Sequence, residues 1–413
     1  MTHVKPSLFT PVLIAGCIIM LVSFSIRAAF GLYQIPIADE FGWVRAEFSM
    51  AIAIQNLAWG IGQPIFAALA ERFGDRKAII LGALVYALGL ALSALATTPF
   101  TKQSLEVLVG FSIAGTGFGV ILAVVGRAAA PEHRSMALAI ATAAGSAGQV
   151  VGPPVVAALL NIMPWQSGFL VTAGAILAVL LVLPWMRRPS PSPKEEFEES
   201  MGTILGKAFR DPSYTLIFLG FFSCGYQLSF VTAHFPAFVT EVCGPIAPGG
   251  FLDSIGVSDT ATLGAWSIAI IGLTNIAGTL LAGKLGNIYP KKYLLAGIYT
   301  GRTIIAALFI LLPMTPLTVV VFSITMGSLW LATVPLTSGL IAHIYGLRYM
   351  GTLYGIVFFS HQLGSFVGVW LGGALYDIYG SYDMVWWVGV AIGAFSALVH
   401  LPIRERPMEM QPA

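Results

Sequence analysis

Long apolar stretches dominate the hydrophobic pattern of this chain. A window of about 20 mostly apolar residues is the template for a helix that crosses a bilayer. The sequence contains twelve such windows, with approximate limits 11–37, 45–70, 78–97, 104–127, 136–160, 166–186, 213–239, 260–285, 292–312, 316–344, 351–375 and 383–402. The pattern therefore predicts an all-α polytopic membrane protein with twelve transmembrane helices.

One long polar connector, residues 187–212, separates the first six predicted spans from the last six. Apolar residues recur within it at helical spacing, namely Phe197, Met201, Ile204, Leu205 and Ala208. This spacing predicts an amphipathic helix that lies on the membrane surface. We therefore expect a six-helix bundle at 1–187, a connector at 188–212 and a second six-helix bundle at 213–413.

The composition supports a membrane protein and argues against several other classes. Only 10% of the residues are charged and the mean hydropathy is +0.85, whereas about 25% of the residues of a soluble domain are charged. The net charge of +2 is small and dispersed, which argues against nucleic-acid binding. We find no catalytic constellation, no metal-ligand spacing and no phosphate-binding glycine loop. We therefore expect no enzyme, no ATP-driven pump and no cofactor or metal, and a monomer suffices.

The distribution of cations predicts how the chain is oriented. Of the 21 Lys and Arg residues, Arg45 and Lys102 lie in connections on one side, and Arg27 and Arg302 lie within predicted spans. The remaining 17 lie in connections on the other side, together with both chain ends. Because cytoplasmic loops are enriched in Lys and Arg, both termini should be cytoplasmic. The expected location is the bacterial inner membrane.

The two predicted bundles are copies of one unit. The segment "SFSIRAAFGLYQIP" at 23–36 matches "SCGYQLSFVTAHFP" at 223–236 with a constant offset of 200, which aligns Arg27 with Gln227. The corner "AALAERFGDRK" at 67–77 is matched by "GKLGNIYPKK" at 283–292. Parallel repeats are typical of transporters that work by alternating access, with the substrate held between the repeats.

The corner at 67–77 resembles the loop between helices two and three of the major facilitator superfamily. That loop has a small residue followed by "DRxGRR"; here Glu71 stands for the aspartate, Arg72, Gly74 and Arg76 match, and Asp75 replaces a cation. The resemblance implies that Glu71, Arg72, Gly74 and Arg76 form a gating loop. Glu71 is expected to pair with cations at a neighbouring corner.

Within that superfamily the chain resembles bacterial relatives of the monocarboxylate transporters. The resemblance rests on "RAAFGLYQIPIADEFGWVRAEFSMAIAIQNLAWGIGQP", "FFSCGYQLSFVTAHFPAF" and "HQLGSFVGVWLGGALYD". Animal members carry an Asp-x-x-x-Arg pair on the eighth helix, where this chain has Asn275 and Thr279. The resemblance implies a monocarboxylate substrate, but that coupling pair does not carry over.

Polar residues inside the spans mark a candidate path for the substrate. Ser23, Arg27, Gly31 and Gln34 fall on one stripe of the first helix, so Arg27 should face a wet interior. Arg302 lies about 15 Å into the ninth helix and is expected either at the periphery or between the eighth and eleventh helices. Further candidates are Gln55, Gln227, Asn275, Tyr354, His361 and Ser365 for substrate binding, and His361 and His234 for proton coupling.

The acidic residues determine the expected charge of the substrate. All 19 are assigned to positions near span ends, with Glu106 among those near the outer ends, so none is expected at mid-membrane. Arg27 and Arg302 then lack a protein counter-ion, and a buried unpaired cation is costly. A bound carboxylate would neutralise a guanidinium with bidentate geometry. The plainer alternatives are that Arg27 binds backbone carbonyls at a bend, that Arg302 serves packing or gating, that His361 is a core histidine and that His234 is a gate or cap.

These observations favour import of a small organic anion, a monocarboxylate, by proton symport. The alternatives that remain open are an organic-anion exchanger, an exporter of drugs or amphiphiles and, from a different class, a membrane sensor that does not transport. The expected partners are a carboxylate substrate, protons and the lipid bilayer.

Overall fold

The computed structural model describes residues 7–43, 45–186 and 200–408. Within this part of the chain the elements are helices and no strand occurs. The prediction of an all-α fold with twelve spans is confirmed, because twelve helical segments are long and apolar enough to cross a membrane. Their ends lie within a few residues of most of the limits expected from hydropathy.

The first half of the chain contains α1 (Pro11–Ala28), η1 (Phe30–Tyr33), α2 (Gln34–Phe41), α3 (Arg45–Phe73), α4 (Asp75–Ser93), α5 (Pro99–Ile113), η2 (Ala114–Thr116), α6 (Phe118–Ala128), η3 (Pro131–His133), α7 (Arg134–Leu160), α8 (Trp165–Ala178) and η4 (Val179–Trp185). The second half contains α10 (Pro212–Val242), α11 (Phe251–Ser254), α12 (Thr260–Leu285), α13 (Lys291–Leu311), α14 (Pro316–Ser328), α15 (Thr333–Tyr345), α16 (Met350–Tyr379) and α17 (Asp383–His400).

A short helix, α9 (Met201–Arg210), precedes the second half. Ser200 caps its start, and Ile204 and Ala208 are buried, so the helix packs one face against the protein as its spacing predicts. Phe197, the first apolar residue of the predicted amphipathic helix, lies outside the described residues.

Several of the described spans are interrupted, which the hydropathy pattern does not predict. The first span passes from α1 into the 3-10 turn η1, so Gly31 does not continue the helical stripe of Ser23 and Arg27. The fourth span breaks at 114–117, where a Cβ on Gly82 of α4 would lie 2.7 Å from the Cα of Gly115. The tenth span breaks at 329–332. Such breaks expose backbone polar groups that other residues must satisfy.

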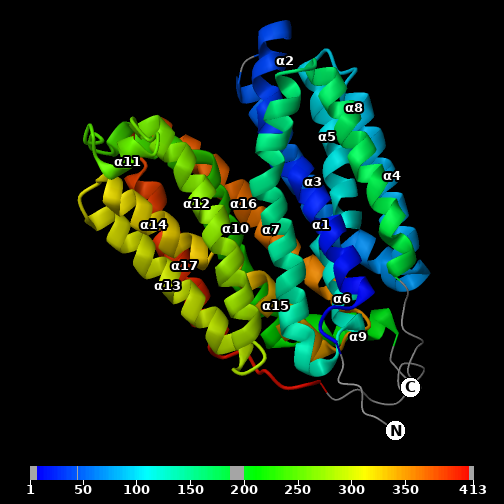
Figure 1. The fold of residues 1–413 in the computed structure, drawn as a ribbon. Coiled ribbons are helices and arrows are strands. Elements are labelled where there is room, and N and C mark those ends of the chain that lie inside the picture. The colour runs from blue at the N-terminus through cyan, green and yellow to red at the C-terminus, as the bar shows by residue number, and fades with distance from the viewer. Residues whose placement is uncertain (1–6, 44, 187–199, 409–413) are drawn as a thin grey trace.

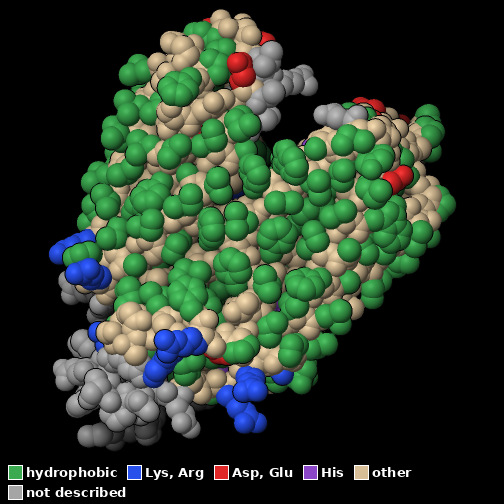
Figure 2. All heavy atoms as spheres, turned by 180° about the vertical axis from the view of Figure 1, so that it is seen from behind, with side chains coloured by type: hydrophobic (Ala, Val, Ile, Leu, Met, Phe, Trp, Pro, Cys, Tyr) green, Lys and Arg blue, Asp and Glu red, His purple; other side chains and the backbone are tan. Residues whose placement is uncertain are grey.

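The two halves form separate bundles that diverge toward one end of the molecule (Figure 1). We call the end where α1 begins and the described chain finishes the terminal end, and the opposite end, which carries α2 and α11, the open end. In Figure 2 a deep notch divides the two lobes at the open end, and Lys and Arg side chains gather at the terminal end of the visible face. A broad apolar band lies between the two ends.

The halves are joined on the terminal side of the notch mainly by α3 with α16 and by α7 with α12, and also by α6 with α16 and α7 with α15. The α3–α16 pair is packed so closely that a Cβ on Gly60 would lie 2.7 Å from the Cβ of Gln362, and a Cβ on Gly355 would lie 2.7 Å from Pro64. A Cβ on Gly283 of α12 would meet Ala139 of α7 at 2.2 Å. The molecule is therefore closed toward the terminal end.

Candidate substrate site

Arg27 lies near the end of α1, beside α3. Its Nη2 donates to Asn56 Oδ1 at 2.6 Å, and the guanidinium carbon lies 4.7 Å from the ring centre of Trp59. The side chain is partly exposed and its Nε has no partner. None of the described carboxylates forms an ion pair with it. The guanidinium is thus fixed on one side and retains donor capacity for an anion.

Buried rings from both halves meet beside Arg27. We call Phe24, Trp59, Phe118 and Phe358 the aromatic layer. Trp59 lies 5.6 Å from Phe24 and 4.8 Å from Phe358 of the other half, between ring centres. Because α3 runs from the open end toward the terminal end, Asn56 and Trp59 lie just on the open side of the Gly60–Gln362 contact. Arg27 therefore sits where the path between the halves closes.

The candidates on α16 lie on the other side of the aromatic layer. His361 is 8% exposed, stacks on Phe358 at 5.2 Å between ring centres, and its Nδ1 has no partner. Tyr354 is fully buried and its hydroxyl has no partner, whereas Ser365 donates to Gly225 O at 3.4 Å. His361 is thus the candidate of this half that lies closest to the layer and retains a free ring nitrogen.

Arg302 has a different environment from Arg27. It is fully buried, and its Nε and Nη2 donate to Leu329 O at 3.0 and 2.6 Å, while Nη2 also donates to Trp330 O. These carbonyls belong to the break in the tenth span, so the expectation that Arg302 reaches between the eighth and eleventh helices is wrong. Donation to backbone carbonyls at a bend, considered above for Arg27, is what Arg302 does.

Asn275 supports the same break from α12. Its Oδ1 accepts from Leu331 N at 2.9 Å and from Thr279 Oγ1 at 3.0 Å, and its Nδ2 donates to Ser146 Oγ of α7 at 2.8 Å. Asn275 therefore satisfies the broken helix and links the two halves, which leaves its amide occupied in this conformation.

Three other candidates point away from Arg27. Gln55 donates to Glu106 Oε2 at 2.7 Å, Gln227 donates to Gly389 O at 3.3 Å, and the Nε2 of His234 pairs with Val369 O at 3.0 Å. His234 is also packed against the rings of Phe230 and Tyr382. The side chain of Gln34 lies outside the described residues.

A charged pair lies buried inside the first half, and the sequence analysis did not predict its burial. Lys102 and Glu106 are each 1% exposed and form an ion pair on α5. Glu106 lies seven residues, or about 10 Å, beyond the start of α5. This position agrees with the expectation of an acid near an outer end, but neighbouring helices cover that turn, so the carboxylate is buried within the bundle.

The corner between α3 and α4 contains the candidate gating loop. Glu71 accepts from Thr352 N at 3.1 Å and from the Thr352 hydroxyl, at the start of α16. Its carboxylate therefore binds a helix N-terminus, which favours negative charge. Arg127 lies within electrostatic reach of Glu71, which agrees with the expectation of a cation from a neighbouring corner. Gly74 has φ +106°, which only glycine adopts readily. Arg76 donates to Met186 O and Pro184 O, and Arg72 is exposed.

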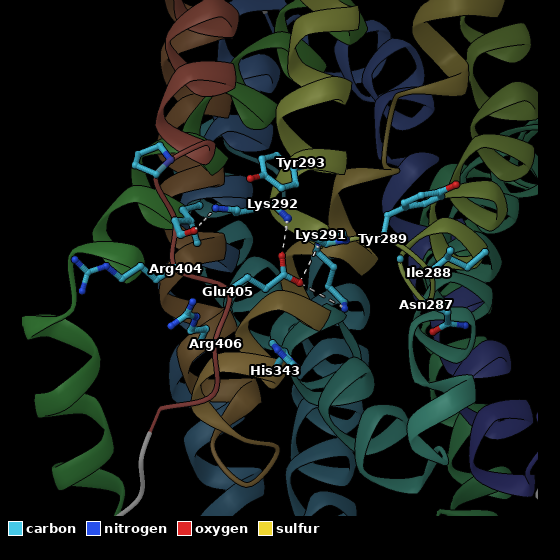
Figure 3. Close-up of a pocket in the computed structure, with 14 residues that line it drawn as sticks. Asn287, Ile288, Tyr289, Lys291, Lys292, Tyr293, His343, Arg404, Glu405 and Arg406 are labelled. Carbon is cyan, nitrogen blue, oxygen red and sulfur yellow. Dashed lines mark hydrogen bonds and ion pairs between the residues drawn. The ribbon is translucent and has the colours of Figure 1, made fainter.

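The matching corner of the second half contains a pocket of about 750 Å³ (Figure 3). Glu405 accepts from the backbone amides of Lys291 and Lys292 at 3.0 Å each, and Lys292 Nζ donates to Ile403 O at 2.9 Å. Here too a carboxylate caps a helix, but both groups belong to the same half. This pocket lies at the terminal end and within the second half, whereas Arg27 lies on the open side of the contact between the halves. We therefore do not assign the substrate to this pocket.

Comparison with known proteins identifies the family. The model of the Major Facilitator Superfamily matches residues 15–369 and 242–413. The chain belongs to the Major Facilitator Superfamily. An uncharacterised transporter of this type, YcxA of Bacillus subtilis (strain 168), is 24% identical over 91% of this chain and 90% of its own length. Monocarboxylate transporter 13 of Bos taurus is 23% identical over 90% of this chain and 83% of its own length.

The solved structures agree with the fold. The fucose transporter FucP in its outward conformation superimposes with a TM-score of 0.71 at 13% identity, over 94% of this chain and 97% of its own. The protein is therefore a multi-pass membrane transporter of the Major Facilitator Superfamily, and the family consists of transporters rather than enzymes.

The sequence analysis did not identify two residues of the candidate site. Asn56, which holds Arg27, and Phe358, which meets Trp59 across the halves, were not singled out. The sequence did contain one signal for Asn56, since Gln55 and Asn56 are successive polar residues in an apolar span. Successive residues of a helix point in different directions, so each of the two needs a partner of its own. Their two partners, Glu106 and Arg27, lie on different helices.

The Glu71 contact leads to a prediction about conformation. Replacing Glu71 with Ala removes the acceptor that ties α3 to the start of α16, so the contact between the halves at the terminal end should weaken by about 1–3 kcal/mol. A cysteine introduced at Ala123, which is buried at this contact, should become more reactive toward a soluble maleimide. The Glu132→Ala variant, which removes an exposed carboxylate at the same end, should leave the reactivity unchanged.

Proposed function

We propose that this transporter carries a small organic anion, a monocarboxylate, together with protons, by alternating access between its two halves. The observation that supports this most directly is Arg27, a partly exposed residue whose buried Nε has no partner and whose charge no described carboxylate neutralises. An isolated cation at this depth is costly unless an anion pairs with it. A carboxylate accepts two parallel hydrogen bonds from a guanidinium.

The surroundings of Arg27 fit one carboxylate with a small organic body. Asn56 and the Trp59 ring hold the guanidinium from behind, which leaves Nε as a free donor. The aromatic layer gives the apolar remainder a dry boundary toward the terminal end. We place His361 of the opposite half at the far side of this layer, where a free ring nitrogen could donate to the substrate or hold a proton. The similarity to monocarboxylate transporter 13 supports the same substrate class.

Arg302 takes a supporting role in this proposal. Because it is fully buried and donates to Leu329 and Trp330 carbonyls, it shapes the broken tenth span rather than contacting the substrate in this conformation. Asn275 acts on the same break from α12. We propose that other candidates contact the substrate only in later conformations of the cycle, namely Tyr354, Ser365, Gln55 and Gln227. The contacts of His234 favour a structural role for this residue.

The orientation is part of the proposal. Lys and Arg residues concentrate at the terminal end, and cations are retained on the cytoplasmic side. We infer that both termini are cytoplasmic, in the inner membrane of a bacterium, and that the notch opens outward. The structure then corresponds to the state that receives substrate from outside.

The test is uptake of labelled carboxylates into proteoliposomes. The panel extends from acetate and lactate through oxalate to an aromatic acid, each with and without an inward proton gradient, and with protein-free liposomes as the control. Accumulation of a monocarboxylate that depends on the gradient supports the proposal. Uptake only into vesicles preloaded with a carboxylate would replace symport with exchange. Saturable binding without flux would indicate a sensor, and absence of both would remove the anion hypothesis and favour an exporter.

A further inference from the structure

The buried pair of Lys102 and Glu106 has no role in the site described above. Both side chains are 1% exposed, and the ammonium group lies 5.0 Å from the ring centre of Phe30 and 4.5 Å from that of Phe169. Lys102 Nζ also donates to Ser93 Oγ at 3.1 Å. Replacing such a pair with apolar residues often costs nothing or stabilises a protein. Ionisable groups inside a membrane domain are therefore functional candidates by default.

Polar groups near Glu106 come from α3, α4 and η1. From α3, Gln55 donates to its Oε2 at 2.7 Å. From α4, the fully buried Tyr86 lies within electrostatic reach of both Glu106 and Arg27, and its hydroxyl has no partner. Tyr33 of η1 lies near Tyr86 and also has an unpaired hydroxyl. The charged groups in this surrounding are Lys102 and Arg27.

The same turn of α3 connects Glu106 with the candidate substrate site. Gln55 binds the carboxylate, and its neighbour Asn56 binds the guanidinium of Arg27 at 2.6 Å. The carbonyl of Gln55 lies so close to α5 that a Cβ on Gly110 would approach it to 2.1 Å. A change in charge or hydrogen bonding at Glu106 therefore acts on a rigid contact that also positions Arg27.

We propose that Glu106, paired with Lys102, is the proton-binding site that couples proton movement to anion transport. This inference rests on the proposed function. In each cycle a proton from the outer water binds the Glu106 carboxylate to give the carboxylic acid, and the same proton is released inside. Lys102 stays protonated throughout. The unpaired Tyr86 hydroxyl interacts electrostatically with both this carboxylate and Arg27, so in this proposal it is the group that connects the two sites.

The physical basis is electrostatic coupling. When Glu106 is protonated, the positive charges of Lys102 and Arg27 lose their negative neighbour in a medium of low dielectric constant, so the attraction for an anion at Arg27 increases. By linkage, a bound anion increases the affinity of Glu106 for its proton by the same factor. Binding of the proton thus increases the affinity for the anion, and binding of the anion increases the affinity for the proton, on the same side of the membrane. Symport requires this mutual dependence.

The experiment compares wild type with Glu106→Gln in proteoliposomes, using the best carboxylate of the panel. Gradient-driven accumulation in the variant should fall to the ratio seen without a gradient, while exchange of labelled for unlabelled carboxylate should persist, since no net proton transfer is needed there. Glu241→Gln, which neutralises an exposed acid, is the matched control and should accumulate normally.

Glu106→Gln leaves Lys102 buried without its partner and could destabilise the fold. The double variant Lys102→Met with Glu106→Gln removes both charges and should also exchange without gradient-driven accumulation. Accumulation by either folded variant at the wild-type ratio would overturn the assignment of Glu106. Absence of any carboxylate transport by wild type would instead refute the proposed function, so the two failures are distinguishable. A variant of His361 to Gln that alone loses accumulation would move the proton site to the other half.

Discussion

The Arg27→Gln variant is expected to lose most of its affinity for a carboxylate substrate. A hydrogen bond to a charged group contributes about 1.5–3 kcal/mol, and each 1.4 kcal/mol changes a dissociation constant tenfold. The dissociation constant should therefore rise by about 10- to 150-fold, and transport at low substrate should fall in proportion. Arg27→Lys keeps the charge but loses the planar fork that lies over Trp59, so its affinity should be intermediate.

Equilibrium binding of the labelled acid to purified protein measures this effect separately from flux. Arg406→Gln removes an exposed guanidinium at the terminal end and is the matched control, with unchanged affinity expected. Thermal unfolding of each variant shows whether the site alone has changed. Wild-type affinity in a folded Arg27→Gln protein would rule out Arg27 as the anion site, and the substrate would have to be sought elsewhere.

The Arg302→Leu variant should lose stability first, in contrast to Arg27→Gln. The substitution leaves the buried carbonyls of Leu329 and Trp330 without the donors that satisfy them. Each buried polar group without a partner costs about 1–3 kcal/mol, so for two carbonyls the free energy of unfolding should fall by roughly 2–6 kcal/mol. Arg302→Lys can reach one carbonyl and should lose about half as much.

Unfolding of the detergent-solubilised protein, followed by circular dichroism, measures this loss. Arg210→Leu, at an exposed position of α9, is the control for removing an arginine. If Arg302→Leu were as stable as wild type but unable to bind the carboxylate, Arg302 would be a substrate residue and the structural interpretation would be wrong. The two experiments thus distinguish a substrate-binding role for Arg27 from a structural role for Arg302, although both are intramembrane arginines in the sequence.

Sequence patterns predicted the spans well because the requirement for membrane crossing is local. Length and apolarity are properties of one segment, and they placed twelve helices with few errors at their ends. Arg27 could also be singled out, because a charge inside an apolar segment is conspicuous whatever its neighbours are. Its partner Asn56 is 29 residues away, and nothing local indicates that the two meet.

The remaining features depend on which helices cover which turns. Glu106 lies near a span end in sequence, yet α3, α4 and η1 enclose the ion pair that it forms with Lys102. Arg302 resembles Arg27 as an intramembrane cation, but its donors meet a break in the tenth span that hydropathy does not register. Glu71 was read from its loop alone, whereas its partner Thr352 belongs to the other half. Each of these features depends on a contact between helices, which a single sequence does not display.

The enclosed charges of the first half have a consequence for bioenergetics. Around the proposed site, Lys102 and Glu106 cancel and Arg27 contributes one positive charge. If both proposals hold, the empty carrier and the carrier loaded with one anion and one proton have the same charge. A membrane potential then acts equally on the outward and the return step, so the cycle is electroneutral. A carrier holding the proton alone has one extra charge, for which 100 mV amounts to about 2.3 kcal/mol. Uptake would follow the pH difference and remain insensitive to voltage.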